Sequence, residues 1–127
     1  MGVYMDLIII PYAYTQSDKK WLGYERIELM KNYNLFNRID PDFLKENSEP
    51  FGLDLKNMVE EDKILINYED QGIKERQYDM MDRPIKYTTA GEFNKINLES
   101  IRDERTKNKL NFIQNLPEET KIVLFYH

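Results

Sequence analysis

The residues best suited to bind a ligand lie between positions 83 and 89 of a chain of 127 residues. Arg83 and Lys86 supply two cations, Tyr87 supplies an aromatic ring, and Thr88 and Thr89 supply two hydroxyl groups. A helix expected to begin after Thr89 would add N–H groups that attract anions. Together these groups predict a site for a small anionic ligand of nucleotide type, with its ring stacked on Tyr87. The alternative is an exposed hairpin strand that leads into a capped helix.

A second candidate lies at Trp21 and Tyr24, close to Lys19 and Lys20. Trp and Tyr carry much of the binding energy in many protein interfaces. These two side chains therefore predict a contact surface for a ligand or for another protein. Core packing of Trp21 is the alternative, and the sequence favours neither interpretation.

The sequence offers little for catalysis. Its single histidine, His127, stands at the end of the chain, where ends tend to fray, so we expect its removal to leave function intact. There is no Cys, which excludes thiolate nucleophiles, disulfides and the usual His/Cys zinc sites. The segment 40–50 begins like an EF-hand but has Leu44 where an oxygen ligand belongs. We expect no metal, no cofactor and no enzymatic activity, and a hydrolase built on carboxylates alone is a remote alternative.

Composition and charge narrow the partners further. The formal net charge of −5 argues against broad binding of nucleic-acid backbones, which requires a basic face. No window approaches the ~20 apolar residues of a membrane-spanning helix. The first ten residues carry Asp6 within their apolar run and lack the basic head of a signal peptide. We therefore expect a cytoplasmic protein without a membrane partner.

The elements that must position these residues can be placed by their hydrophobic patterns. Val3 to Ile10 and the final run KIVLFY are apolar on both faces, so we expect these two strands to be neighbours at the centre of a sheet. Tyr33, Phe36 and Ile39 recur at spacing three, which predicts a short helix that packs them on that sheet. The other expected elements are strands at 23–30 and 63–71, a helical turn after Asp54, a hairpin at 72–88 that turns around 79–84, a capped helix at 90–96 and a helix at 98–115.

These elements predict an α+β fold in a single domain, residues 1–127, with a mainly antiparallel or mixed sheet and two to four helices packed on it. No internal repeat, linker or low-complexity segment divides the chain.

The order of three short motifs and a closing strand resembles a family of small, poorly characterised tailed-bacteriophage proteins. The motifs are KNYNLF at 31–36, EPFGLD at 49–54 and YTTAGEF at 87–93, followed by a helix and KIVLFY. Phe51 and Asp54 depart from the Arg and Pro of the family pattern, and DRPIK at 82–86 replaces a run rich in His and Ser. The matching residues are Asn32, Tyr33, Leu35, Phe36, Glu49, Pro50, Gly52, Leu53, Thr89 and Glu92.

The resemblance implies a phage or prophage origin, and small phage proteins without catalytic equipment generally act by binding. We therefore expect a non-enzymatic counter-defence or host-takeover protein in the cytoplasm of the infected bacterium. Its function would be to sequester a small nucleotide signal within a symmetric homo-oligomer. The alternative is an inhibitor or adaptor that docks on a host enzyme through a tyrosine-rich surface.

Overall fold

The computed structural model describes residues 2–11, 20–23, 25–44, 49–58, 62–68 and 72–127. Its centre is an antiparallel pair of strands, β1 (Met5–Ile10) and β8 (Lys121–Tyr126). All six residues of β1 and the last five of β8 are buried. The prediction that the first and last strands lie side by side is confirmed. Strands this apolar on both faces are stable only inside a sheet.

Three further strands complete a five-stranded sheet in the order β3-β1-β8-β7-β4, in which every neighbouring pair is antiparallel. They are β3 (Glu25–Leu29), β7 (Lys86–Thr89) and the two-residue strand β4 (Lys56–Asn57). β4 occupies part of the segment after Asp54 for which a helical turn was predicted, so that prediction is wrong. The predicted α+β class with a mainly antiparallel sheet is confirmed.

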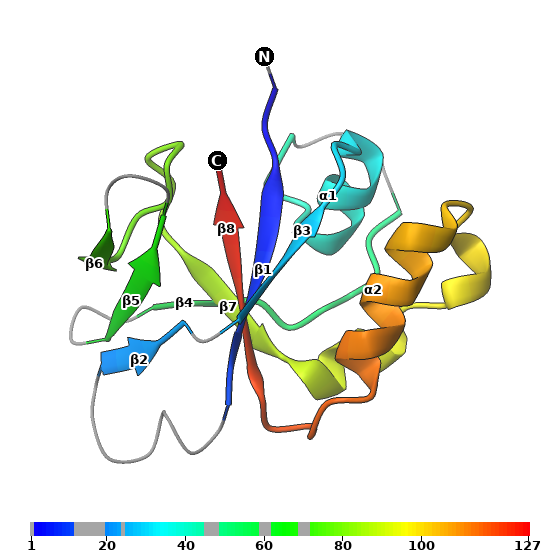
Figure 1. The fold of residues 1–127 in the computed structure, drawn as a ribbon. Helices are drawn as coiled ribbons and strands as arrows, with labels where there is room; N and C mark the ends of the chain where they lie inside the picture. Colours follow the sequence, from blue (N-terminus) through cyan, green and yellow to red (C-terminus); the bar gives the residue numbers. More distant parts are fainter. Residues whose placement is uncertain (1, 12–19, 24, 45–48, 59–61, 69–71) are drawn as a thin grey trace.

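A smaller sheet covers one face of the central sheet. It consists of β2 (Lys20–Leu22), β5 (Lys63–Asn67) and β6 (Ile73–Arg76) in the order β2-β5-β6, with β2 and β5 parallel. Trp21, Ile64 and Ile66 pack against Ile8, Val123 and other apolar residues of the central sheet. In Figure 1 the central strands are seen nearly edge-on, with β2, β5 and β6 on one side and the helices on the other.

The helical layer covers the opposite face. It contains α1 (Tyr33–Ile39), the short 3₁₀ helices η3 (Ala90–Lys95) and η4 (Leu98–Ser100), and α2 (Glu104–Gln114). The single helix predicted over 98–115 is wrong in detail, because the chain leaves helical geometry after Ser100 and α2 begins at Glu104. The Asp103 carboxylate caps α2 by accepting hydrogen bonds from the amide and the hydroxyl of Thr106.

The motif around Tyr33 and Phe36 anchors α1 to the central sheet, as predicted. Asn32 caps the helix by accepting a hydrogen bond from the Leu35 amide at 3.0 Å. Phe36 is fully buried, and the Tyr33 hydroxyl accepts a hydrogen bond from the Val3 amide at 2.9 Å. Both rings contact Phe43, so α1 and the segment after it form one aromatic cluster.

The segment predicted as a simple hairpin at 72–88 connects the two sheets instead. β6 pairs with β5 in the small sheet, whereas β7 pairs with β8 in the central sheet. The two arms meet only near the turn, through the bridge between Tyr78 and Pro84 and the bonds from the Asp79 amide to Arg83 and from the Ile85 amide to Gln77. The predicted turn around 79–84 is confirmed, but its arms diverge because β6 belongs to the small sheet that covers one face and β7 belongs to the central sheet itself.

Phe36→Ala should lower the free energy of unfolding by ~3–5 kcal/mol, because it leaves a cavity where α1 meets the sheet. Ile73→Ala removes an apolar side chain that is 66% exposed and serves as the control, with an expected loss of less than ~0.5 kcal/mol. Chemical denaturation of the three proteins measures both changes. Equal stabilities of the Phe36 variant and the parent would contradict the packing of α1 described above.

Candidate functional site

The two cations of the predicted ligand site, Lys86 and Arg83, are both bound by oxygen atoms of the protein itself. Lys86 lies on the helical side of β7, where its ammonium group is 3.0 Å from Asp40 Oδ1 and 2.9 Å from Asp42 Oδ2. Asp40 is itself buried and also accepts a hydrogen bond of 2.7 Å from the Tyr126 hydroxyl. Burial alone would lower the pKa of Lys86, but the hydrogen bonds to Asp42 and Asp40 together outweigh it and raise the pKa above its usual value. The charge of Lys86 is thus balanced by carboxylates of the protein itself.

Arg83 fixes the turn that precedes β7. Its guanidinium donates a hydrogen bond of 3.2 Å to the Phe43 carbonyl and lies 5.0 Å and 5.4 Å from the ring centroids of Phe43 and Tyr126. Together with Asp40 and Lys86 it lines a cavity of about 280 Å³ that holds acidic as well as basic groups. An anion entering this cavity would have to compete with carboxylates already paired there.

Tyr87 lies on the other face of the sheet from Lys86, because neighbouring residues of a strand point to opposite sides. Its ring packs edge-on against Trp21 with centroids 4.8 Å apart. The ammonium group of Lys121 lies 4.9 Å from each of these two rings. The structure therefore brings Tyr87 and Trp21 together, but it separates Tyr87 from Lys86 by the thickness of the sheet.

The remaining predicted site residues do not complete a ligand site. Thr88 is buried on the helical side, opposite Ile122, and Thr89 lies on the Tyr87 side, opposite Lys121. Tyr24 lies outside the described residues. Trp21 is 5% exposed, which favours the core interpretation of that residue over the contact surface.

The helix that follows Thr89 has no open N-terminus of the kind predicted. Thr89 makes no capping hydrogen bond with its side chain, so the prediction that Thr89 caps this helix is wrong. The amides of Ala90 and Gly91 donate to the carbonyls of Thr120 and Glu118 at 2.8 Å and 3.1 Å. Glu92 instead accepts from the Asp54 amide and pairs with Lys95, whose hydrogen bond lowers the pKa of the Glu92 carboxyl. These backbone donors are not available to a phosphate.

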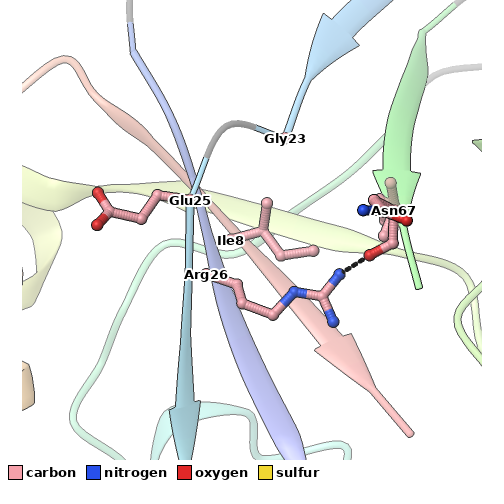
Figure 2. Close-up of a pocket in the computed structure, with 6 residues that line it drawn as sticks. Ile8, Gly23, Glu25, Arg26 and Asn67 are labelled. Carbon is pink, nitrogen blue, oxygen red and sulfur yellow. Dashed lines mark hydrogen bonds between the residues drawn. The ribbon is translucent and has the colours of Figure 1, made fainter. Parts of the chain in front are cut away.

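A small pocket between β3 and β5 brings together residues that were not predicted. It encloses about 180 Å³ and is lined by Ile8, Gly23, Glu25, Arg26, Ile66 and Asn67. Figure 2 shows Arg26 extending across Ile8 to the Asn67 carbonyl, to which it donates a hydrogen bond, while Glu25 points the other way. The volume is below the ~300–1,000 Å³ typical of small-ligand pockets.

Behind this pocket, Arg26 joins a polar network at one end of the central strands. The other guanidinium nitrogen donates a hydrogen bond of 3.1 Å to the buried Asp6 carboxylate. Asp6 Oδ1 lies 3.0 Å from His127 Nε2, and the Tyr68 hydroxyl lies 3.4 Å from His127 Nδ1. Both ring nitrogens of His127 thus face protein groups, which leaves neither open to a substrate.

His127 is well anchored, contrary to the expectation that it frays. Its amide and carbonyl exchange hydrogen bonds with Tyr4 at 3.0 Å and 2.8 Å, and its side chain is 14% exposed. Ligand atoms of Asp6, Glu28 and His127 lie within 4.8 Å of one another, a spacing that suits a metal ion. However, Arg26 already neutralises Asp6, and a guanidinium this close opposes the binding of a second cation.

A larger pocket lies between α1 and α2. It has a volume of about 460 Å³, and its lining includes Arg38, Arg102 and the α2 cap Asp103. Arg38 is fixed by a hydrogen bond of 3.0 Å to the Glu49 carbonyl and by stacking on Phe51 at 4.1 Å. Hydrogen bonds from Thr106 lower the pKa of Asp103, so its negative charge balances part of the basic lining.

The turn at 78–84, called the tip here, is an exposed feature held by several hydrogen bonds. Asp79 Oδ1 accepts hydrogen bonds from the amides of Met81 and Arg83 at 2.8 Å and 3.1 Å. Asp82 adopts a left-handed conformation with φ of 58°, and the Met80 amide donates to the Tyr126 carbonyl at 3.1 Å. The tip is therefore held both within itself and against β8.

Two large apolar side chains project from the tip. Tyr78 is 56% exposed and Met81 is 43% exposed, whereas Met80 packs into the core beneath them. Tyr4, 37% exposed, lies at the same end of the sheet, since it pairs with His127 while Met80 bonds to the preceding residue, Tyr126, which ends β8. Tyr4 and Tyr78 are the exposed tyrosines of the described chain, and we call Tyr4, Tyr78 and Met81 the tip surface.

Sequence reasoning missed the residues that organise this end of the molecule. Asp6 was noted for interrupting an apolar run, and a carboxylate within such a run is a signal that a cation must be close. The partners Arg26 and His127 are 20 and 121 residues away in the sequence, so no local pattern could identify them. Asp79 carried a local signal, because Asp at the start of a turn often accepts hydrogen bonds from amides two residues on.

Comparison with protein-family models, with curated proteins and with solved structures finds no match to this chain. The resemblance to tailed-phage proteins therefore stays a prediction. No helix within the described ranges is long and apolar enough to cross a membrane.

His127→Ala should lower the free energy of unfolding by ~1–3 kcal/mol, because the buried Asp6 carboxylate loses a partner. Glu119→Ala, a change at an exposed residue, is the control and should leave stability unchanged within ~0.5 kcal/mol. Urea denaturation at neutral pH measures the difference. An unaltered midpoint for the His127 variant would return this residue to the incidental role predicted from the sequence.

Asp79→Asn should be at least as stable as the parent at neutral pH. Burial raises the pKa of Asp79, so the folded state holds this proton more tightly than the unfolded state. The contribution of Asp79 to stability is therefore largest below about pH 4 and is lost as the pH rises through the folded-state value. The Asn side chain keeps an oxygen that can accept from Met81 and Arg83.

The free energies of unfolding of parent and variant should converge as the pH falls to about 4, which denaturation at a series of pH values can measure. Asp82→Asn changes an exposed side chain, and Asn tolerates the same left-handed backbone. Its difference from the parent should not vary in this way. A deficit of Asp79→Asn that grows as the pH rises would contradict this expectation and show that the tip requires the ionised carboxylate.

Proposed function

We propose that this protein is a non-enzymatic binding protein that docks on another protein through the tip surface. In line with the resemblance to phage proteins, the partner would be a host enzyme in the cytoplasm of an infected bacterium, and docking would inhibit or redirect it. Of the two functions expected from the sequence, this is the alternative, and the placement of the predicted ligand residues favours it.

The main support is a preorganised surface. Tyr78 and Met81 stand exposed on a turn that Asp79, Arg83 and Met80 hold in one conformation. A rigid surface loses little conformational entropy when a partner binds, so more of the contact energy appears as affinity. Tyr and Met are also enriched in protein interfaces relative to the rest of the surface.

Further support comes from the cations. A protein that sequesters a nucleotide needs cations free to meet phosphate groups beside an aromatic ring. Lys86 is paired with two carboxylates, Arg83 is bound to Phe43, and Tyr87 lies across the sheet from Lys86. The groups proposed for a nucleotide thus support the fold of the tip and of β7.

Sequestration of a nucleotide-type ligand remains the second candidate function, at a different place from the one predicted. The pocket of about 460 Å³ beside Arg38 and Arg102 falls within the range of small-ligand pockets. Two guanidinium groups can bind a phosphate by paired hydrogen bonds. Calorimetric titration of the parent with cyclic and linear nucleotides tests this candidate directly.

The docking proposal can be tested by photo-crosslinking in bacterial cells, with a benzophenone amino acid at position 81 or, as a control, at the exposed position 73. A partner captured at position 81 and not at 73 is then purified. Its affinity is measured for the parent, for Tyr78→Ala/Met81→Ala and for Ile73→Ala.

We expect the double variant to bind at least ~10-fold more weakly, since a single interface residue of this kind contributes about 1.4 kcal/mol or more. Ile73→Ala should bind like the parent. Equal affinities for all three proteins would refute docking through the tip surface. Saturable binding of a nucleotide, with no partner captured at position 81, would instead support the second candidate function, sequestration of a nucleotide-type ligand.

A further inference from the structure

The outer edge of β3 is open along the described chain. β3 is the last strand on its side of the central sheet, and β1 is its one described neighbour. In Figure 1 it lies at the near edge of the central strands, with no strand drawn beyond it. The strand at the opposite edge, β4, has only two residues, so β3 is the longer of the two edges available for pairing.

The residues whose backbone groups point outward follow from the hydrogen bonds of the central strands. Tyr4 and His127 exchange both of their backbone hydrogen bonds. Since the pattern alternates along antiparallel strands, Asp6 and then Ile8 also direct their N–H and C=O groups to β8. The residues of β3 that lie opposite Asp6 and Ile8 therefore receive no backbone hydrogen bonds from them.

Those residues are Glu28, opposite Asp6, and Arg26, opposite Ile8. Their N–H and C=O groups consequently point away from β1, into the space beyond the sheet. The bond from the Lys109 ammonium group to the Glu28 carbonyl agrees with this direction. Both side chains are exposed on the face of the small sheet, whereas Ile27 lies between them on the helical face.

We propose that β3 pairs antiparallel with β3 of a second copy of this chain, about a two-fold axis at Ile27, which joins the two central sheets into one. Only residues with outward groups can form hydrogen-bonded pairs, which allows an axis at Arg26, Ile27 or Glu28. An axis at Arg26 would place Arg26 opposite itself, and an axis at Glu28 would place Glu28 opposite itself. The axis at Ile27 instead places Arg26 opposite Glu28 of the second copy, twice.

This register is favourable for both charge and hydrogen bonding. Opposite charges that face each other across antiparallel strands are stabilising, and like charges in the same position are destabilising. The outward N–H and C=O groups of Arg26 bond to those of Glu28 in the other copy. The two Ile27 side chains meet on the helical face, where each is already partly buried against the core.

The side of α2 nearest this edge supplies a second reason for a copy of the same chain. Lys109 reaches the Glu28 carbonyl, and Phe112 lies one helical turn further on the same side of α2. Phe112 is 46% exposed, which makes it a large apolar side chain beside an open strand. The two-fold axis keeps both helical layers on one side of the joined sheet. The two α2 helices therefore come together and cover the exposed Phe112 side chains.

Lys109 does not prevent this pairing. A carbonyl oxygen has two lone pairs, so Glu28 can accept from the Arg26 amide of the second copy while Lys109 remains bound. The interface rests on few hydrogen bonds, so the dimer is expected to dissociate on dilution. The tip at 78–84 bonds to β8, so it lies on the side of β1 away from β3.

Sedimentation of the parent over a range of concentrations should show a reversible monomer–dimer equilibrium. Glu28→Lys places a cation opposite Arg26 of the second copy and should weaken the dimer at least ~10-fold. Glu25→Lys makes the same change of charge on the same strand but on the opposite face, and should leave the dimer constant unchanged. Glu28→Pro removes an outward N–H group that β1 does not use, and should also yield monomers.

Hydrogen exchange gives a readout that does not depend on variants. The amides of Arg26 and Glu28 should exchange quickly in dilute parent protein and slowly in concentrated protein. A parent that remains monomeric at every concentration, or equal weakening by Glu28→Lys and Glu25→Lys, would overturn the proposal. A dimer retained by a folded Glu28→Pro variant would do the same.

Discussion

The rest of the structure depends on the pairing of β1 with β8. Both strands are apolar on both faces, so water must be excluded from both sides of the pair. The helices cover one side with Phe36 and Phe93, and the small sheet covers the other with Trp21 and two isoleucines of β5. The chain must therefore pass from one layer to another, and the 78–84 tip is where β6 of the small sheet gives way to β7 of the central sheet.

Three buried aspartates fix the elements around this pair. Asp6 connects β1 to Arg26 of β3 and to His127, which directly follows β8, and Asp40 connects the end of α1 to Lys86 of β7 and Tyr126 of β8. Asp79 organises the tip from within. A buried carboxylate is tolerated only when donors or cations surround it. This requirement explains why cations that stand out in the sequence as ligand groups are directed inward.

Features formed by residues close together in the sequence could be predicted, whereas contacts between residues far apart in the sequence could not. The two central strands and the packing of Tyr33 and Phe36 could be predicted, because a hydrophobic period is local and reports burial directly. The opposite directions of Lys86 and Tyr87 could also have been predicted, since strand residues alternate. The pairing of Lys86 with Asp40 could not, because 46 residues separate them and any of the 23 acidic residues was an equal candidate. The break at 101–103 depended on the capping carboxylate of Asp103 competing with continuation of the helix.

The two proposed surfaces lie on different parts of the central sheet and can therefore act together. The tip bonds to β8 on the side away from β1, whereas the open edge belongs to β3, beyond β1. A dimer joined at β3 would carry two tips on one rigid sheet. Two linked contacts raise the apparent affinity for a partner that is itself oligomeric, because the second contact forms within the complex already bound. A weak pairing of β3 would thus strengthen docking on such a partner without any change in the tip, and a monomeric partner would gain nothing from it.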